Sequence, residues 1–192
     1  MCKLAIDAIK TIASSAVSAS AAAAALSGDH DAPPAPLTSK DIDIKRFARI
    51  EKIPGGSFDE SRVLSGVVLN KDILHPKMRR RIENPRILLL DCPLEYKKGE
   101  SMTGVNLEKE EDFELLLKLE DEYVKNLCND IAKFKPDLVI TEKGISDLAQ
   151  YYFVKNGITA LRRLRKTDND RVARAVGATI CNRTSEIRES DI

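Results

Sequence analysis

The sequence predicts an α/β fold in which strands and helices alternate. Leu138 to Thr141 is a short apolar run rich in β-branched residues, as is typical of a buried strand. Ser146 can cap a helix over Asp147 to Lys155, and Asn156-Gly157 can end that helix before another strand begins at Ile158. A strand, a helix and a strand in this order belong to an α/β layer.

The helix of this unit is expected to have a buried face and an outer face. The expected buried face consists of apolar residues at helical spacing, namely Ile145, Leu148, Ala149, Tyr152 and Phe153. The expected outer face consists of Asp147, Gln150, Tyr151, Val154 and Lys155. An outward tyrosine and valine fit an ordinary helix that covers a sheet and has two apolar residues at its margin. They also fit a surface that binds exposed apolar chain, and periodicity alone leaves both readings open.

The chain before this unit divides into a helix, a low-complexity stretch and a series of strands. Met1 to Ile12 has apolar residues at helical spacing, whereas residues 13–40 are rich in alanine, serine and proline and predict a flexible insertion. Strands are expected over residues 48–53, 63–69 and 86–91. His75-Pro76 and Asn84-Pro85 exclude one continuous helix between the last two of these strands.

The remaining elements are a long helix and a short helix that leads to a last strand. Residues 107–134 carry an apolar stripe made of Phe113, Leu116, Leu117, Tyr123, Leu127, Cys128 and Ile131. An unbroken helix of this length would measure about 40 Å, so part of it is expected to project from the domain. A helix is expected over Asp168 to Ala175, with Gly177 ending it, and a strand over Thr179 to Cys181.

Composition and motifs argue against several classes of function. Lys and Arg total 31 against 30 for Asp and Glu, so no net charge attracts nucleic acid or an anionic membrane over long range. The four cysteines are far apart and form no C-x-x-C pair, which predicts free thiols and no metal site. No phosphate-binding loop or hydrolase motif occurs, so no catalytic residues are predicted. The alanine-rich start is too polar to span a bilayer, which predicts a cytoplasmic protein.

Two basic clusters remain, Arg79 to Arg81 and Arg162 to Lys166. Arg162 and Arg163 would face opposite sides of a strand and so would not form one patch. Both clusters lack interleaved aromatic residues that would stack on single-stranded bases, so nucleic-acid binding is the weakest alternative.

Four long runs resemble the apical domain of the eukaryotic cytosolic chaperonin TRiC, of the T-complex protein 1 family of group II chaperonins, and most closely that of its gamma subunits. The runs are DIDIKRFARIEKIPGG, GVVLNKDILHPKMRRRIENPRILLLDCPLEYKKGE, KPDLVITEKGISDLAQYYF and ALRRLRKTDNDRVARAVGA. The resemblance implies a swivelling β/β/α apical domain over residues 41–192, with a helical protrusion at about residues 95–122. Residues 1–12 are similar to a helix of the neighbouring intermediate domain.

The resemblance also implies a function and a set of site residues. The family folds non-native polypeptides such as actin and tubulin, and its subunits assemble with one another into a hetero-oligomeric double ring that uses ATP and magnesium. The implied substrate-binding residues are Asp147, Gln150, Tyr151, Val154 and Lys155 on the helix, with Lys71, His75, Lys77 and Met78 on a neighbouring loop. No cofactor is expected in this chain, because the equatorial, nucleotide-binding part of the family is absent from it.

The chain is therefore expected to be a fragment with an open sheet edge that leaves Val67, Val68, Leu88 and Leu89 partly uncovered. The alternative to a ring subunit is a stand-alone interaction module or holdase without ATPase activity.

Overall fold

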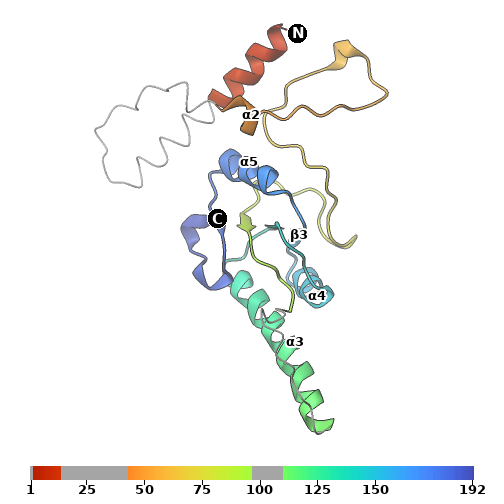
Figure 1. Cartoon of the computed structure of the whole chain (residues 1–192), viewed down its shortest axis with the longest axis vertical. Helices are drawn as coiled ribbons and strands as arrows, with labels where there is room; N and C mark the ends of the chain where they lie inside the picture. Colours follow the sequence, from red (N-terminus) through yellow and green to blue (C-terminus); the bar gives the residue numbers. More distant parts are fainter. Residues whose placement is uncertain (1, 14–42, 97–109) are drawn as a thin grey trace, which may run out of the picture. The chain divides into compact units, whose positions relative to one another are not determined.

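The computed structural model describes residues 2–13, 43–96 and 110–192 (Figure 1). It divides into two compact units, one formed by Met1–Leu69 with Asp170–Gly177 and the other by Asn70–Asn169 with Ala178–Ile192. Most of the predicted insertion over residues 13–40 and residues 97–109 of the predicted protrusion lie outside the described residues. No helix in the described part of the chain is both long and apolar enough to cross a membrane.

The second unit is built on a parallel sheet with the strand order β3-β2-β1-β4. The strands are β1 (Ile87–Leu90), β2 (Leu138–Thr141), β3 (Thr159–Leu161) and β4 (Ile180–Cys181). All strand pairs are parallel, and Leu88 lies opposite Val139. Strands that are covered on both faces are apolar along their whole length, which explains the Ile-Leu-Leu-Leu sequence of β1. The predicted α/β class is confirmed.

The helices lie where the sequence predicts them, with slightly different ends. They are α3 (Glu110–Lys133), α4 (Asp147–Lys155) and α5 (Lys166–Val176). The Ser146 side chain caps α4 by accepting a hydrogen bond from the backbone N–H of Ala149 at 3.2 Å. Gly157 follows α4 with φ +69°, a left-handed conformation that favours glycine and lets the chain turn into β3.

Helix α3 is buried only towards its carboxyl end. Val124, Cys128 and Ile131 are buried at successive turns, whereas no residue from 112 to 123 is buried. Phe113, Leu117 and Tyr123 of the predicted stripe are exposed by 52%, 47% and 43%. Figure 1 shows the amino-terminal half of α3 running away from the sheet, as the predicted projection requires.

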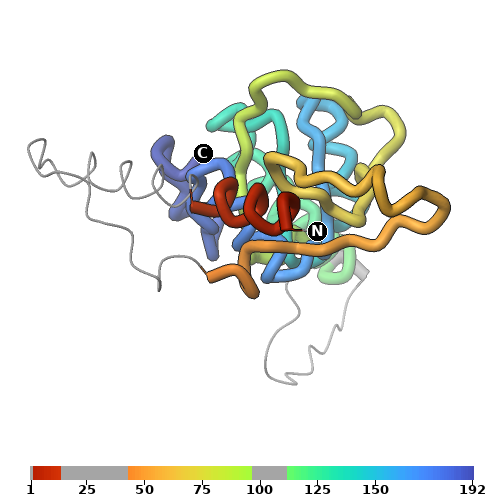
Figure 2. Tube along the Cα trace, turned by 90° about the horizontal axis from the view of Figure 1, so that it is seen from above, coloured from red at the N-terminus to blue at the C-terminus, as the bar shows by residue number. Residues whose placement is uncertain are grey.

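The first unit contains a helix over residues 2–13, the short helix α2 (Ile44–Phe47) and the 3₁₀ turn η1 (Phe58–Glu60). The strands predicted over residues 48–53 and 63–69 are wrong, because both segments are irregular. Ile50 and Ile53 are 89% and 83% exposed, and no described strand pairs with them. Figure 2 shows this stretch, in orange and gold, as an extended path that turns back on itself.

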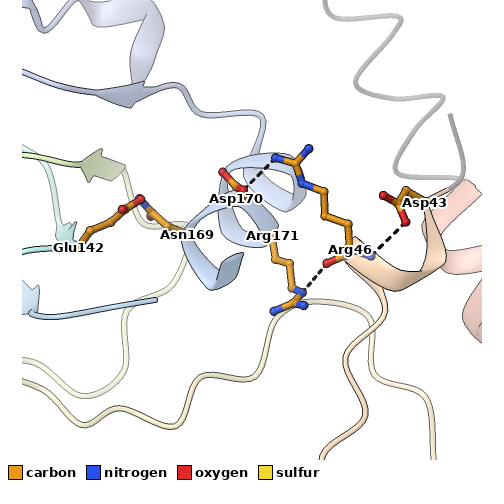
Figure 3. A network of polar contacts seen from close by, with 6 residues as sticks. All are labelled: Asp43, Arg46, Glu142, Asn169, Asp170 and Arg171. Atoms are coloured by element: carbon orange, nitrogen blue, oxygen red, sulfur yellow. Dashed lines mark hydrogen bonds and ion pairs between the residues drawn. The ribbon is translucent and has the colours of Figure 1, made fainter. Parts of the chain in front are cut away.

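Polar and ring contacts join α2 to the end of α5 within the first unit (Figure 3). The Arg46 guanidinium lies 2.9 Å from the Asp170 carboxylate, and the Arg171 Nε donates a hydrogen bond to the Arg46 carbonyl at 2.8 Å. The guanidinium carbon of Arg174 lies 3.9 Å from the centre of the Phe47 ring, within cation–π distance. These contacts fix α2 although none of its residues is buried.

The predicted open sheet edge is not found at the residues named for it. Leu88 and Leu89 are 0% exposed, which contradicts the expectation that they are partly uncovered. A loop lies beside the edge strand β3, and its Leu74 N–H donates to the Ala160 carbonyl at 3.0 Å. Next to β4, the Thr179 N–H donates to the Asp191 carbonyl at 3.3 Å. Val67 is half-buried and Val68 is 50% exposed.

The core thiols are expected to react slowly. Burial raises the pKa of Cys128 to about 12 and is also the main cause that raises the pKa of Cys181 to about 11. Because only the thiolate is nucleophilic, iodoacetamide near pH 8 should label the exposed Cys2 first and leave Cys128 unmodified until the protein unfolds. Peptide mass spectrometry over a labelling time course checks this order, and native labelling of Cys128 as fast as Cys2 would contradict it.

Candidate functional site

Helix α4 separates buried and exposed side chains almost as its spacing predicts. Ile145, Ala149 and Phe153 are buried, and Leu148 and Tyr152 are partly buried against the same core. On the outer face, Asp147 and Lys155 are exposed, Gln150 is half-buried and Tyr151 is 59% exposed. The ring of Tyr151 meets the ring of Tyr152 edge to face, with centroids 5.6 Å apart. The aromatic ring of Tyr151 is therefore exposed to solvent on a helix that the core holds in place, and Asp147 and Lys155 lie on either side of it along α4.

Val154 departs from the predicted outer face. It is half-buried and packs against the core cluster, so it lies at the margin of the helix. The exposed surface of α4 is therefore formed by Asp147, Gln150, Tyr151 and Lys155.

The predicted loop over residues 71–78, here called the 71–78 loop, lies along the edge strand β3. Besides the bond from Leu74 to Ala160, the Ala160 N–H donates to the Met78 Sδ at 3.4 Å. The Thr159 hydroxyl donates to the Arg79 carbonyl at 3.0 Å, directly after the loop. The two bonds to Ala160 use backbone groups on the side of β3 that no described strand covers.

The four predicted loop residues do not share one environment. Lys71 and Lys77 are exposed and His75 is half-buried, whereas Met78 is only 6% exposed and belongs to the core. The Lys77 N–H donates to the His75 Nδ1 at 3.1 Å, and the Met78 N–H donates to the His75 carbonyl at 3.0 Å. Burial removes Met78 from the candidate surface, because its side chain is not available to a partner.

A polar junction links the loop to the carboxyl end of α4. The Arg79 Nη2 donates to the Asp137 Oδ1 at 2.8 Å and to the Gly157 carbonyl at 3.1 Å. The Arg86 N–H donates to the other carboxylate oxygen of Asp137 at 3.2 Å. The hydrogen bond from Arg79, followed by that from the Arg86 backbone, lowers the pKa of Asp137 below its usual value.

An open pocket of about 400 Å³ lies at this junction. It is lined by Arg79, Ala132, Lys135, Pro136, Asp137, Asn156, Gly157 and Ile158. The residues after α3 and those after α4 therefore meet at one place.

Within the first arginine cluster, Arg79 differs from Arg80 and Arg81, because it takes part in the junction. Sequence reasoning missed the junction because Arg79 was one member of a run of three arginines, and nothing in that run distinguishes it. Arg80 and Arg81 form ion pairs on the surface, with Asp72 at 3.4 Å and with Glu83 at 3.2 Å.

In the second cluster, β3 ends at Leu161 and Arg163 has φ +53°. The premise that Arg162 and Arg163 alternate along a strand is therefore wrong.

Comparison with known proteins identifies the family. The chain matches the TCP-1/cpn60 chaperonin family over residues 3–192. It belongs to this family. It is 70% identical over 152 residues to T-complex protein 1 subunit gamma of Thalassiosira weissflogii, covering 79% of this chain and 27% of that protein. It is 54% identical to the same subunit of Schizosaccharomyces pombe over 192 residues, which is 100% of this chain and 33% of that protein.

A human relative and a solved structure agree with this assignment. Human T-complex protein 1 subunit gamma is 61% identical over 153 residues, which is 80% of this chain and 28% of the human protein. The open-state monomer of a group II chaperonin from Methanococcoides burtonii superposes with a TM-score of 0.61 at 31% identity, covering 78% of this chain and 31% of that one. The chain thus has a chaperonin fold of the mixed α/β kind and spans about a third or less of these relatives.

Proposed function

We propose that this chaperonin-family chain carries a surface that binds non-native polypeptides. The observation that carries the proposal is the outer surface of α4, where Tyr151 is 59% exposed although Ala149 and Phe153 anchor the opposite side of the helix in the core. Asp147, Gln150 and Lys155 surround it with charge and hydrogen-bonding groups. Such a surface can bury apolar segments of a client and select among clients by charge. Lys71, His75 and Lys77 of the 71–78 loop complete the proposed surface.

The assignment of residues 41–192 to an apical domain is part of the same proposal. So are assembly with other subunits into a cytoplasmic double ring and the use of ATP and magnesium by the complete subunit. Among the described residues, no three His, Cys, Asp or Glu side chains are grouped so that they could hold a metal ion.

Client capture tests the proposal directly. Guanidine-denatured actin is diluted into buffer with the 192-residue chain and without ATP, and complex formation is followed by analytical ultracentrifugation. Tyr151→Ser should weaken capture by about tenfold, since an exposed aromatic anchor at an interface contributes about 1.4 kcal/mol or more. Thermal stability should change by no more than about 0.5 kcal/mol, because the side chain is exposed.

A matched tyrosine provides the control. Tyr123 lies on α3 and is 43% exposed, so Tyr123→Ser removes a similar ring from a different helix. It should leave capture within about twofold of the unmodified chain. Equal capture by the unmodified chain and Tyr151→Ser would refute the proposed surface. Co-purification with other chaperonin subunits separates a ring component from the alternative of a stand-alone holdase.

A further inference from the structure

We propose that the contact between Arg79 and Asp137 positions the 71–78 loop against the end of α4, so that loop and helix present one client-binding surface. This inference rests on the proposed function, because it names the residues that hold together the two parts of that surface. Neither residue belongs to the surface itself.

Arg79 is suited to this role because it contacts the body of the unit at separate points. Its guanidinium donates to the Asp137 carboxylate at 2.8 Å and to the Gly157 carbonyl at 3.1 Å. Its backbone carbonyl accepts the hydrogen bond from the Thr159 hydroxyl at 3.0 Å. Gly157 is two residues beyond Lys155, the last residue of α4. The arginine thus connects the loop to the residues that immediately follow the helix.

The surroundings favour a cation at this point. Helices α3 and α4 end at Lys133 and Lys155, and the carboxyl end of a helix carries partial negative charge. Residues after both helix ends line the pocket that contains Arg79. The Arg79 guanidinium is planar and can donate to a carboxylate and a carbonyl together, which a lysine ammonium does less well.

Asp137 is a fixed acceptor for this guanidinium. Its Oδ2 accepts from the Arg86 N–H at 3.2 Å, and its own backbone N–H donates to the Arg86 carbonyl at 2.9 Å. Arg86 immediately precedes β1, and Asp137 immediately precedes β2. The carboxylate is therefore held by the start of the central strands.

The contact is expected to set the position of the loop more than the stability of the fold. The side chains of Arg79 and Asp137 are 52% and 31% exposed, and exposed ion pairs contribute little to folding. Loss of the pair leaves the burial of Met78 and the bond from Leu74 to Ala160 in place. Arg79→Ala should therefore loosen the loop between these two fixed points without unfolding the unit.

Amide hydrogen exchange of the loop is the primary measurement. The Lys77 and Met78 amides, which bond to His75, should exchange about tenfold faster in Arg79→Ala and Asp137→Asn. Exchange of the β2 amides should not change. Arg79→Lys, which keeps the charge, should give an intermediate rate. Arg80→Ala is the control, because Arg80 is adjacent and exposed, and it pairs with Asp72 on the surface.

An NMR titration of the Asp137 carboxyl gives a second readout, which a general loosening of the fold would not change in the same way. The pKa of Asp137 is lowered mainly by the hydrogen bond from Arg79, so in Arg79→Ala it should rise towards the ordinary aspartate value. Because the pKa of Asp137 is lowered in the folded state, the contact with Arg79 is complete at pH values above the ordinary aspartate range. It is lost as the pH falls through the folded-state pKa. Arg86, whose backbone also bonds to the carboxylate, remains in the variant.

The outcomes separate the inference from the proposed function. Faster loop exchange in Arg79→Ala together with weaker client capture supports both. Faster exchange with unchanged capture, in a chain whose Tyr151→Ser variant loses capture, overturns the link between loop position and binding. Unchanged exchange and an unchanged Asp137 pKa in Arg79→Ala overturn the positioning role, whether or not the chain binds clients.

Discussion

Replacing Phe153 by alanine is expected to destabilise the unit that contains the sheet by about 3–5 kcal/mol. Phe153 is 0% exposed and is the largest fully buried side chain in the described part of the chain. It packs in the core with Ala149, one turn earlier on α4, and with Ile145, which precedes the helix. Removing the ring takes away its burial and leaves a cavity that the surrounding strands cannot fill. Urea unfolding followed by circular dichroism at 222 nm measures the loss.

Tyr151 provides the matched comparison, since it lies two residues earlier on the same helix and is 59% exposed. Tyr151→Ala should change the free energy of unfolding by no more than about 0.5 kcal/mol. Equal losses for the two variants would mean that the assignment of inner and outer faces of α4 is wrong. The client-binding proposal would then lose its support as well.

The central strands and α4 could be predicted because each carries its own local signal. The Ile-Leu-Leu-Leu run of β1 and the Leu-Val-Ile-Thr run of β2 are apolar throughout, as strands covered on both faces must be. The period of α4 identified Ala149 and Phe153 as buried and Tyr151 as exposed. The capping serine identified where the helix begins.

The wrong strands over residues 48–53 and 63–69 show where a local signal is insufficient. Both segments contain β-branched and apolar residues, which favour strands. A strand also requires a partner that accepts its hydrogen bonds, and in the described structure these segments have none. Whether a partner exists depends on distant residues, so the segment's own sequence cannot decide it.

The same limit applies to the junction and to Met78. Asp137 is 58 residues from Arg79, and Ala160 is 82 residues from Met78. The 71–78 loop has no helical or strand period, so the sequence gives no indication of which of its side chains turn inward. Val154 lies at the edge of the apolar stripe of α4, and its partial burial depends on how the core packs around it.

Replacing Met78 by alanine is expected to cost about 2–5 kcal/mol, which distinguishes a core residue from a surface contact. Met78 is 6% exposed and packs with the core of the sheet unit. Its sulfur accepts the hydrogen bond from the Ala160 N–H at 3.4 Å on the edge strand β3. The shorter side chain would leave a cavity and an unpaired amide on that strand, and both effects destabilise the fold.

Lys77→Ala is the control for Met78→Ala, because Lys77 is the preceding residue and its side chain is exposed. Lys77→Ala should change the free energy of unfolding, measured from the urea midpoint, by no more than about 0.5 kcal/mol. If the 71–78 loop contributes to binding, loss of the lysine charge should weaken the capture of acidic clients. A Met78→Ala chain with the stability of the unmodified chain and reduced client capture would show that Met78 contacts clients directly. The loop would then have to open from β3 to expose it, and the arrangement proposed for Arg79 and Asp137 would have to be abandoned.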